Sequence, residues 1–115
     1  MRLTKKKVPI YFGRLDIVIS KDFKKSADTL GMKWDQFDVS LYDAFTYQRR
    51  SKKGYSRYVV FLKPNCTAKV VAHEATHIVN YIFNDVHVKA DSHNDEPFAY
   101  LLGWVVGEIH KSLKK

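Results

Sequence analysis

The stretch that most constrains the fold is VVAHEATHIVNYIF, residues 70–83, because apolar residues occupy nearly every side of the helix it predicts. Two adjacent stripes at helical spacing consist of Val71, Ala75, Ile78 and Ile82, and of Val70, Ala72, Val79 and Phe83. A helix that is apolar all round is buried in a protein core. We therefore expect a buried helix over residues 68–84, capped by Asn65 or Thr67.

The rest of the chain predicts strands first and a second long helix last. Apolar residues alternate over residues 8–20, which predicts a strand, and a change of parity at Gly13 suggests a bulge there. They also alternate over residues 37–47 and 55–62, and these two segments predict a hairpin with its turn near residues 51–54. Residues 21–32 suggest a short helix ended by Gly31. Asn94 or Asp95 caps the last helix, with Pro97 in its first turn.

This order predicts an α+β fold, in which a three-stranded, mostly antiparallel sheet packs against the two long helices. A length of 115 residues fits one domain over residues 1–115, and the 45% hydrophobic content is that of a globular chain. Cys66 is the single cysteine, which excludes an intrachain disulfide and a thiolate-rich metal site. Any metal would be held by histidine and carboxylate side chains.

Positive charge is concentrated in the first part of the chain. Residues 1–70 carry 16 Lys/Arg against 6 Asp/Glu, and residues 71–115 carry 4 against 6, so the two parts hold +10 and −2. We interpret this charge mainly as a solubility feature, because no nucleic-acid motif accompanies it; a nucleic-acid partner is the less favoured alternative. No stretch approaches the roughly 20 apolar residues of a membrane span, and nothing resembles a signal-peptide core. We expect a cytoplasmic protein without a membrane partner, and no pattern sets an oligomeric state.

Titratable residues within the apolar helix carry the chemistry. His73 and His77 stand four residues apart, so both project from one helix face at a spacing that lets their imidazoles reach one zinc ion. Glu74 lies about 100° round the helix from His73 and can act as general base on a water at that metal. Burying these three groups unpaired would cost on the order of several kcal/mol, which favours a metal site over two satisfied core histidines.

A catalytic zinc ion takes three protein ligands and leaves one position for water, so a third ligand is required. Glu96 is the preferred choice, because it opens the last helix and 18 residues separate it from His77. Its alternative role is to complement the dipole of that helix. His93 is the second choice, and the full set of candidates is His87, Asp91, His93, Asp95, Glu96 and His110. We expect one Zn²⁺ per chain.

HEATH at residues 73–77, followed by Glu96 in NDEPFAYLLGWV, resembles the gluzincins, whose pattern is HExxH followed by a helix-borne glutamate. The closer resemblance is to small zincin-like metallopeptidases of phages and prophages, and it covers residues 8–106. It implies His73, His77 and Glu96 as zinc ligands, Glu74 as base, and the host cytoplasm as location. It also implies that residues 55–62 form an edge strand that pairs with an extended substrate, which makes Tyr58, Val59 and Val60 the substrate-binding residues.

We therefore expect a zinc metallopeptidase that hydrolyses a protein or peptide substrate. The group that stabilises the tetrahedral intermediate is unassigned in the sequence, with Tyr58, His87 and His93 as weak candidates. One alternative is a zinc-stabilised binding or regulatory module acting on a host protein or nucleic acid without proteolysis, which the basic stretch RRSKKGYSR, residues 49–57, weakly favours. Another is a regulatory protease similar to the phage-associated enzymes that cleave repressors.

Overall fold

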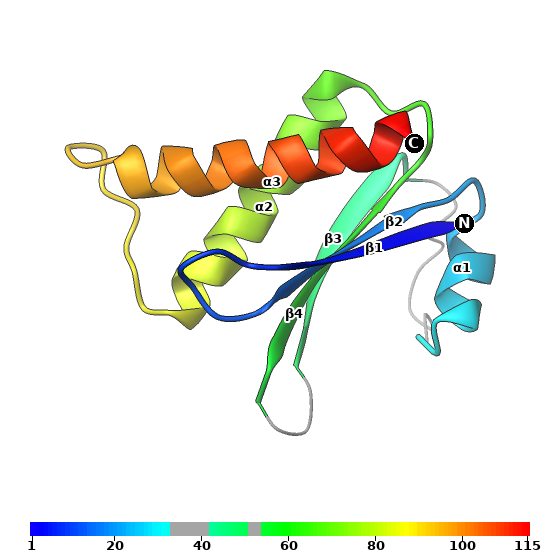
Figure 1. The fold of residues 1–115 in the computed structure, drawn as a ribbon, viewed down its shortest axis with the longest axis horizontal. Coiled ribbons are helices and arrows are strands. Elements are labelled where there is room, and N and C mark those ends of the chain that lie inside the picture. Colours follow the sequence, from blue (N-terminus) through cyan, green and yellow to red (C-terminus); the bar gives the residue numbers. More distant parts are fainter. Residues whose placement is uncertain (33–41, 51–53) are drawn as a thin grey trace.

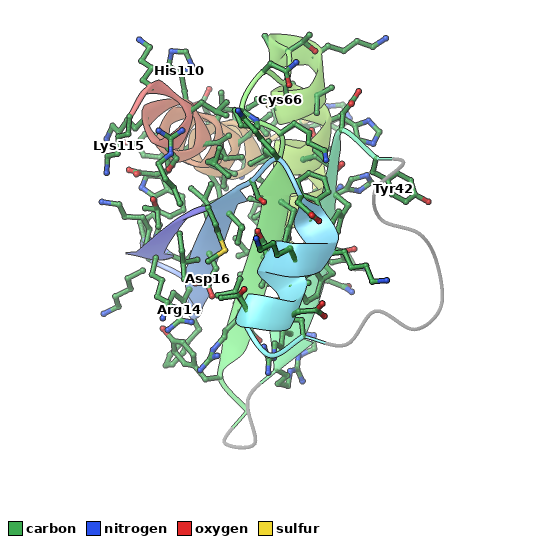
Figure 2. The ribbon with its side chains drawn as sticks, turned by 90° about the vertical axis from the view of Figure 1, so that its right-hand side faces the viewer. Arg14, Asp16, Tyr42, Cys66, His110 and Lys115 are labelled. Carbon is green, nitrogen blue, oxygen red and sulfur yellow. The ribbon has the colours of Figure 1, made fainter. Side chains whose placement is uncertain are left out.

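The protein is described by a computed structural model for residues 1–32, 42–50 and 54–115. It is an α+β structure with a mixed four-stranded sheet (Figure 1). The elements follow one another as β1 (Arg2–Lys7), β2 (Arg14–Ile19), α1 (Phe23–Thr29), β3 (Ala44–Arg50), β4 (Ser56–Leu62), α2 (Ala68–Asp85) and α3 (Glu96–Lys114). Helices α2 and α3 pack on one face of the sheet, and Figure 2 shows α1 in front of the sheet on the opposite face.

The strand order across the sheet is β1-β2-β4-β3. Strand β2 pairs antiparallel with β1 and parallel with β4, and β4 pairs antiparallel with β3. The prediction of three strands is therefore wrong by one strand, and a parallel pair lies at the centre. The inner strands carry the segments LDIVI, which is apolar except for Asp16, and YVVFL, as expected where both sheet faces are covered.

The additional strand, β1, lies before the region that was predicted as one bulged strand. Residues 8–20 contain the turn between β1 and β2 and the whole of β2, and β1 lies before them. The chain reverses where Ile10 and Gly13 adopt φ angles of 65° and 117°, and the Val8 N–H donates to the Gly13 carbonyl at 3.0 Å. The parity change at Gly13 thus marks a turn and not a bulge.

The hairpin of β3 and β4 is confirmed, with Ala44 opposite Leu62 and Arg50 opposite Ser56. Residues 37–41 of its predicted first strand, and most of its predicted turn, fall outside the described residues. The short helix is confirmed as α1, and Gly31 follows it with a φ of 75°.

Both long helices are confirmed: α2 ends one residue beyond its predicted bounds, and α3 begins directly after the predicted cap Asp95. Thr67 caps α2 by accepting a hydrogen bond from the Val70 N–H, and Pro97 is the second residue of α3. However, α2 is not buried all round: one side packs against the sheet and α3, and the other side is open to solvent. No helix within residues 1–32, 42–50 and 54–115 is long and apolar enough to span a membrane.

Candidate metal centre

His73 and His77 lie on the solvent-facing side of α2, in its middle turns. Both side chains are exposed, their ring centroids are 4.8 Å apart, and the ring planes meet at 78°. The two Nε2 atoms are 3.2 Å apart. The pair is therefore accessible from solvent and presents two neighbouring imidazole nitrogens. This exposure corrects the expectation of a buried pair, which relied on α2 being apolar on every side.

The separation of the two nitrogens can be compared with what zinc requires. Two nitrogens that each lie about 2.05 Å from a tetrahedral ion stand about 3.3 Å apart. The observed 3.2 Å matches this distance, and it also allows an N–H···N hydrogen bond between two neutral rings when no metal is bound. The spacing of the histidine pair is thus that of two ligand positions in a zinc site.

Glu74 points toward the sheet and is 7% exposed. In a regular helix it projects about 100° from His73 and about 60° from His77 around the axis, so it flanks the histidine pair. The Thr46 hydroxyl of β3 donates a hydrogen bond to Glu74 Oε2 at 2.8 Å. The other carboxylate oxygen, Oε1, accepts no hydrogen bond from the residues that the structure describes. Glu74 is thus anchored through one oxygen.

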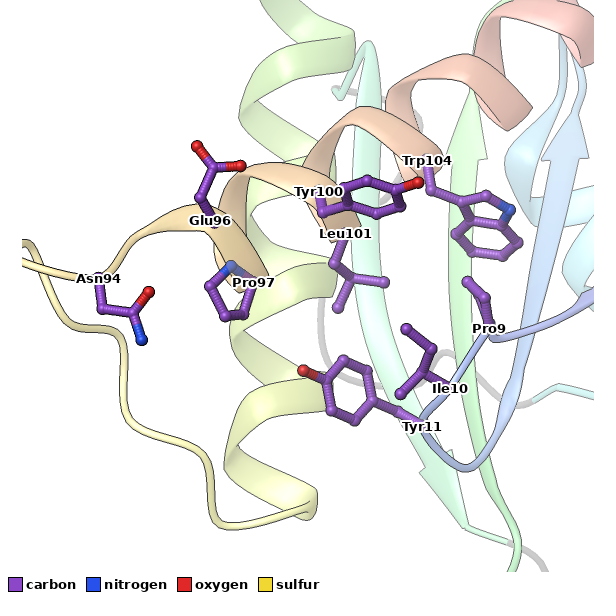
Figure 3. A pocket seen from close by; sticks show the side chains of 9 residues that line it. All are labelled: Pro9, Ile10, Tyr11, Asn94, Glu96, Pro97, Tyr100, Leu101 and Trp104. Atoms are coloured by element: carbon purple, nitrogen blue, oxygen red, sulfur yellow. The ribbon is translucent and has the colours of Figure 1, made fainter.

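The third predicted ligand, Glu96, is not grouped with this pair in the described residues. In the described parts of the chain, no group of three His, Cys, Asp or Glu side chains is arranged to hold a metal ion. Glu96 is exposed at the first residue of α3, beside an apolar pocket formed with the β1–β2 turn (Figure 3). Its carboxylate points away from Ile10 and Tyr11 on the far wall of that pocket. The structure therefore pairs His73 with His77, places Glu74 next to His73 on α2, and does not group Glu96 with them in the described residues.

The other candidate ligands are also solvent-exposed. His87, Asp91, His93 and Asp95 lie in the connection from α2 to α3, and His110 lies in the second half of α3. Within this connection the Asp91 carboxylate accepts a hydrogen bond from the His93 backbone N–H at 2.9 Å. None of these residues forms a three-ligand group with the histidine pair in the described chain.

The predicted substrate strand is wrong, because β4 is an inner strand whose two edges pair with β2 and β3. Tyr58, Val59 and Val60 are at most 1% exposed and cannot pair with a substrate. The Tyr58 hydroxyl donates to Asp85 Oδ2 at 2.5 Å, and burial and this hydrogen bond raise the pKa of Tyr58. Tyr58 is thus a structural group. The sheet edge beside α2 belongs to β3.

Sequence reasoning missed the polar face of β3. Thr46, Gln48 and Arg50 alternate with Phe45 and Tyr47 along the strand, and all three polar side chains bond to carboxylates of α2. Those carboxylates belong to Glu74 and Asp85, which are eleven residues, or about three helical turns, apart and so share one helix face. Two signals in the sequence could have revealed this contact. Polar residues alternate with aromatic ones in AFTYQRR, and the two acidic residues of α2 are spaced so that they lie on one face of the helix.

Asp85, the last residue of α2, accepts hydrogen bonds from Tyr58, from the Gln48 amide and from the Arg50 guanidinium. Burial alone would raise the pKa of Asp85, but the hydrogen bonds from Tyr58 and Gln48, with the charge of Arg50, outweigh it and lower the pKa. This cluster fixes the end of α2 to β3 and β4. It thereby sets how α2 lies along β3, and so where Glu74 meets Thr46.

Comparison of the chain with protein-family models, with curated proteins and with solved structures gave no match.

Proposed function

We propose that this protein is a zinc-dependent metallopeptidase, in the manner of the zincin-like enzymes that its sequence resembles. His73 and His77 are two of the zinc ligands and Glu74 is the general base. The observation that carries the proposal is the exposed histidine pair, whose Nε2 atoms stand 3.2 Å apart beside a carboxylate held by Thr46. An exposed histidine pair and a flanking, anchored glutamate are three of the parts that metal-assisted hydrolysis requires, beside a third ligand.

When bound, zinc would lower the pKa of a water molecule toward neutrality and polarise the scissile carbonyl. Glu74 would take a proton from the attacking water through Oε1, while its Oε2 stays bonded to Thr46. Glu74 would then pass that proton to the leaving amine nitrogen as the C–N bond breaks. The Thr46 hydroxyl fixes the orientation of the carboxylate in both steps, because it holds one oxygen and leaves the other to move the proton.

The substrate in this proposal is a peptide in extended conformation. Strand β3 is the sheet edge nearest the site, since Thr46 at its centre bonds to Glu74. An exposed edge offers backbone donors and acceptors to a further strand, and this is a common way to hold a peptide. A peptide paired with β3 would run past Glu74 and the histidine pair. Substrate pairing is thus assigned to β3, in place of Tyr58, Val59 and Val60.

Glu96 remains the proposed third ligand. The first turn of α3 would have to approach the histidine pair when metal binds, because Glu96 is not grouped with the histidines in the structure described here. Zinc affinity, measured by competition with a chelating dye, distinguishes Glu96 from the other candidate third ligands. Glu96→Ala should weaken affinity by at least tenfold, while Asp95→Ala, the neighbouring carboxylate, should leave it unchanged. If His93→Ala weakens affinity and Glu96→Ala does not, the third ligand is His93.

The proposed activity is tested by Glu74→Gln, which keeps the size of the side chain and removes its basicity. General-base catalysis contributes roughly 10²–10⁴-fold, so kcat on a peptide library or unfolded protein should fall by about that factor while zinc content is kept. Glu108→Gln is the matched control, because Glu108 is a comparably buried glutamate on α3, 9% exposed, and bonds to Lys111 away from the histidines. Hydrolysis by Glu74→Gln at the wild-type rate would refute the mechanism.

A further inference from the structure

Four basic residues stand in one row across all four strands of the sheet. Arg14 of β2 pairs in register with Lys7 of β1 on one side and with Arg57 of β4 on the other, and Arg57 pairs with Arg49 of β3. Side chains at such positions project from the same sheet face. This face is the one that α1 covers further along the strands, and it is opposite to the face that carries α2 and the histidine pair.

The row concentrates like charge at short range. Neighbouring strands lie about 4.8 Å apart, so the four residues span about 14 Å. Like charges directly opposite each other destabilise a sheet. Asp16, two residues after Arg14 on the same face of β2, offsets the charge of Arg14. Its carboxylate accepts two hydrogen bonds from Arg14, at 2.7 and 2.9 Å, and Figure 2 shows the two side chains together. The row therefore keeps a net charge of +3 (four cations and one anion).

A small cavity of about 100 Å³ lies over this part of the sheet, lined by Arg14, Asp16, Arg49 and Arg57 together with Lys5 and apolar residues. Arg57 Nε is buried and has no hydrogen-bond partner among the described residues. A buried guanidinium donor without a partner carries a desolvation cost that a hydrogen bond would remove. The row therefore has room for an anionic group beside three arginine side chains.

We propose that this row, Lys7, Arg14, Arg57 and Arg49, binds the phosphodiester backbone of a single-stranded nucleic acid. Three of the four cations are arginines, whose planar guanidinium groups match phosphate oxygens in pairs. The cavity has room for one phosphate group, but Lys7 lies outside it and Arg49 is exposed, so the row extends to a ligand with several consecutive anions. Basic surfaces that follow the phosphate backbone are a common means of binding single strands.

This site is independent of the proposed zinc chemistry, because it lies on the other face of the sheet and shares no residue with it. It also changes the interpretation of the basic charge. In sequence the cations are scattered over residues 7–57 and are typical of a solubility feature, whereas the strand register collects four of them into a single line.

The test is fluorescence anisotropy with a labelled oligothymidylate of about a dozen nucleotides, titrated at several salt concentrations. Each neutralised phosphate contributes about −0.7 to the slope of log K against log salt, so three to four contacts predict a slope of about −2 to −3. Lys7→Gln and Arg49→Gln should each reduce the slope by about 0.7, and the double variant by about 1.4. Lys69→Gln and Lys89→Gln are matched controls: they remove the same charge from exposed positions off the row and should leave the slope unchanged.

Circular dichroism and thermal melting establish that each variant is folded before its affinity is compared. The proposal is overturned if the oligonucleotide does not bind at low salt, or if the control variants change the slope as much as the row variants. Competition identifies the ligand class. If polyglutamate displaces the oligonucleotide at an equal concentration of charge, the row is a surface for acidic proteins; if inorganic phosphate does so at an equal concentration of phosphate, it is a site for a single anion. Either result would overturn the nucleic-acid assignment.

Discussion

Asp85→Asn tests whether the carboxylate at the end of α2 holds the helix against the sheet. The Asp85 side chain is 15% exposed, and it accepts hydrogen bonds from the Tyr58 hydroxyl at 2.5 Å, from Gln48 Nε2 at 2.6 Å and from an Arg50 guanidinium nitrogen at 2.8 Å. Asparagine has the same shape, but it offers one acceptor atom and no charge. At least one of the three donors must then lose its partner.

The loss of stability arises mainly at Tyr58, because its side chain is fully buried, whereas the exposed Arg50 guanidinium can form hydrogen bonds with water. A hydrogen bond to a charged group contributes about 1.5–3 kcal/mol net, so we expect the free energy of unfolding to fall by about 2–3 kcal/mol at pH 7. The melting temperature should fall by about 3–5 °C per kcal/mol for a chain of this size. Asp91→Asn, at an exposed carboxylate in the α2–α3 connection, should change stability by less than about 0.5 kcal/mol.

The pH dependence has a definite sign. The hydrogen bonds to Asp85 outweigh the effect of burial and lower its pKa below the ordinary value of 3.8. A carboxylate whose pKa is lowered by folding contributes stability that is fully present above its unfolded-state pKa and is lost as the pH falls through the folded-state pKa. The difference between wild type and Asp85→Asn should therefore be constant from neutral pH down to about pH 5 and shrink below about pH 4.

A double-mutant cycle measures the coupling between the Asp85 and Tyr58 side chains, with urea unfolding of wild type, Asp85→Asn, Tyr58→Phe and the double variant. Because the two side chains share one hydrogen bond, their effects should be non-additive by about 1 kcal/mol or more. Additive effects, or a loss below about 0.5 kcal/mol for Asp85→Asn, would show that this cluster does not hold α2 in place.

Two further predictions concern the turn before β2 and the anchor of Glu74. Gly13→Ala should destabilise the protein by more than about 1 kcal/mol in urea unfolding, because the added Cβ would lie 2.7 Å from the Tyr58 ring; Gly31→Ala, also at positive φ but with nothing within 4 Å, should cost less. Thr46→Val should lower kcat without removing zinc, because Glu74 loses its anchoring hydrogen bond. Thr46→Ser keeps the hydroxyl and should keep kcat near the wild-type value. Equal kcat values for the valine and serine variants would exclude this positioning role.

Local patterns in the sequence predicted the helices well. The bounds of α2 follow from its apolar spacing and from Thr67, and Pro97 marks the first turn of α3. The same local reasoning predicted His73, His77 and Glu74 as neighbours, because positions within one helix are fixed relative to each other by its geometry. Their exposure was misjudged, since a helix with alanines on its open side looks apolar all round while half of it faces water.

Features that depend on residues far apart in the chain were not predictable in this way. The turn at residues 8–13 relies on a positive φ at Ile10, which an isoleucine does not signal. Because β2 pairs in parallel with β4, β4 is an inner strand and β3 is an edge strand. A substrate strand can therefore pair with β3 and not, as predicted, with β4. The distance between Glu96 and the histidine pair depends on the path of the α2–α3 connection, on which residue spacing gives no information.

The measurement that tests the central claim most directly is the zinc content of purified protein by mass spectrometry, for wild type, Glu74→Gln, His77→Ala and His110→Ala. We expect about one zinc per chain in wild type and in Glu74→Gln, and little in His77→Ala. His110→Ala removes an exposed histidine from the far part of α3 and should keep the metal. Zinc retained in full by His77→Ala, or absent from wild type after reconstitution, would contradict a metal centre at the histidine pair.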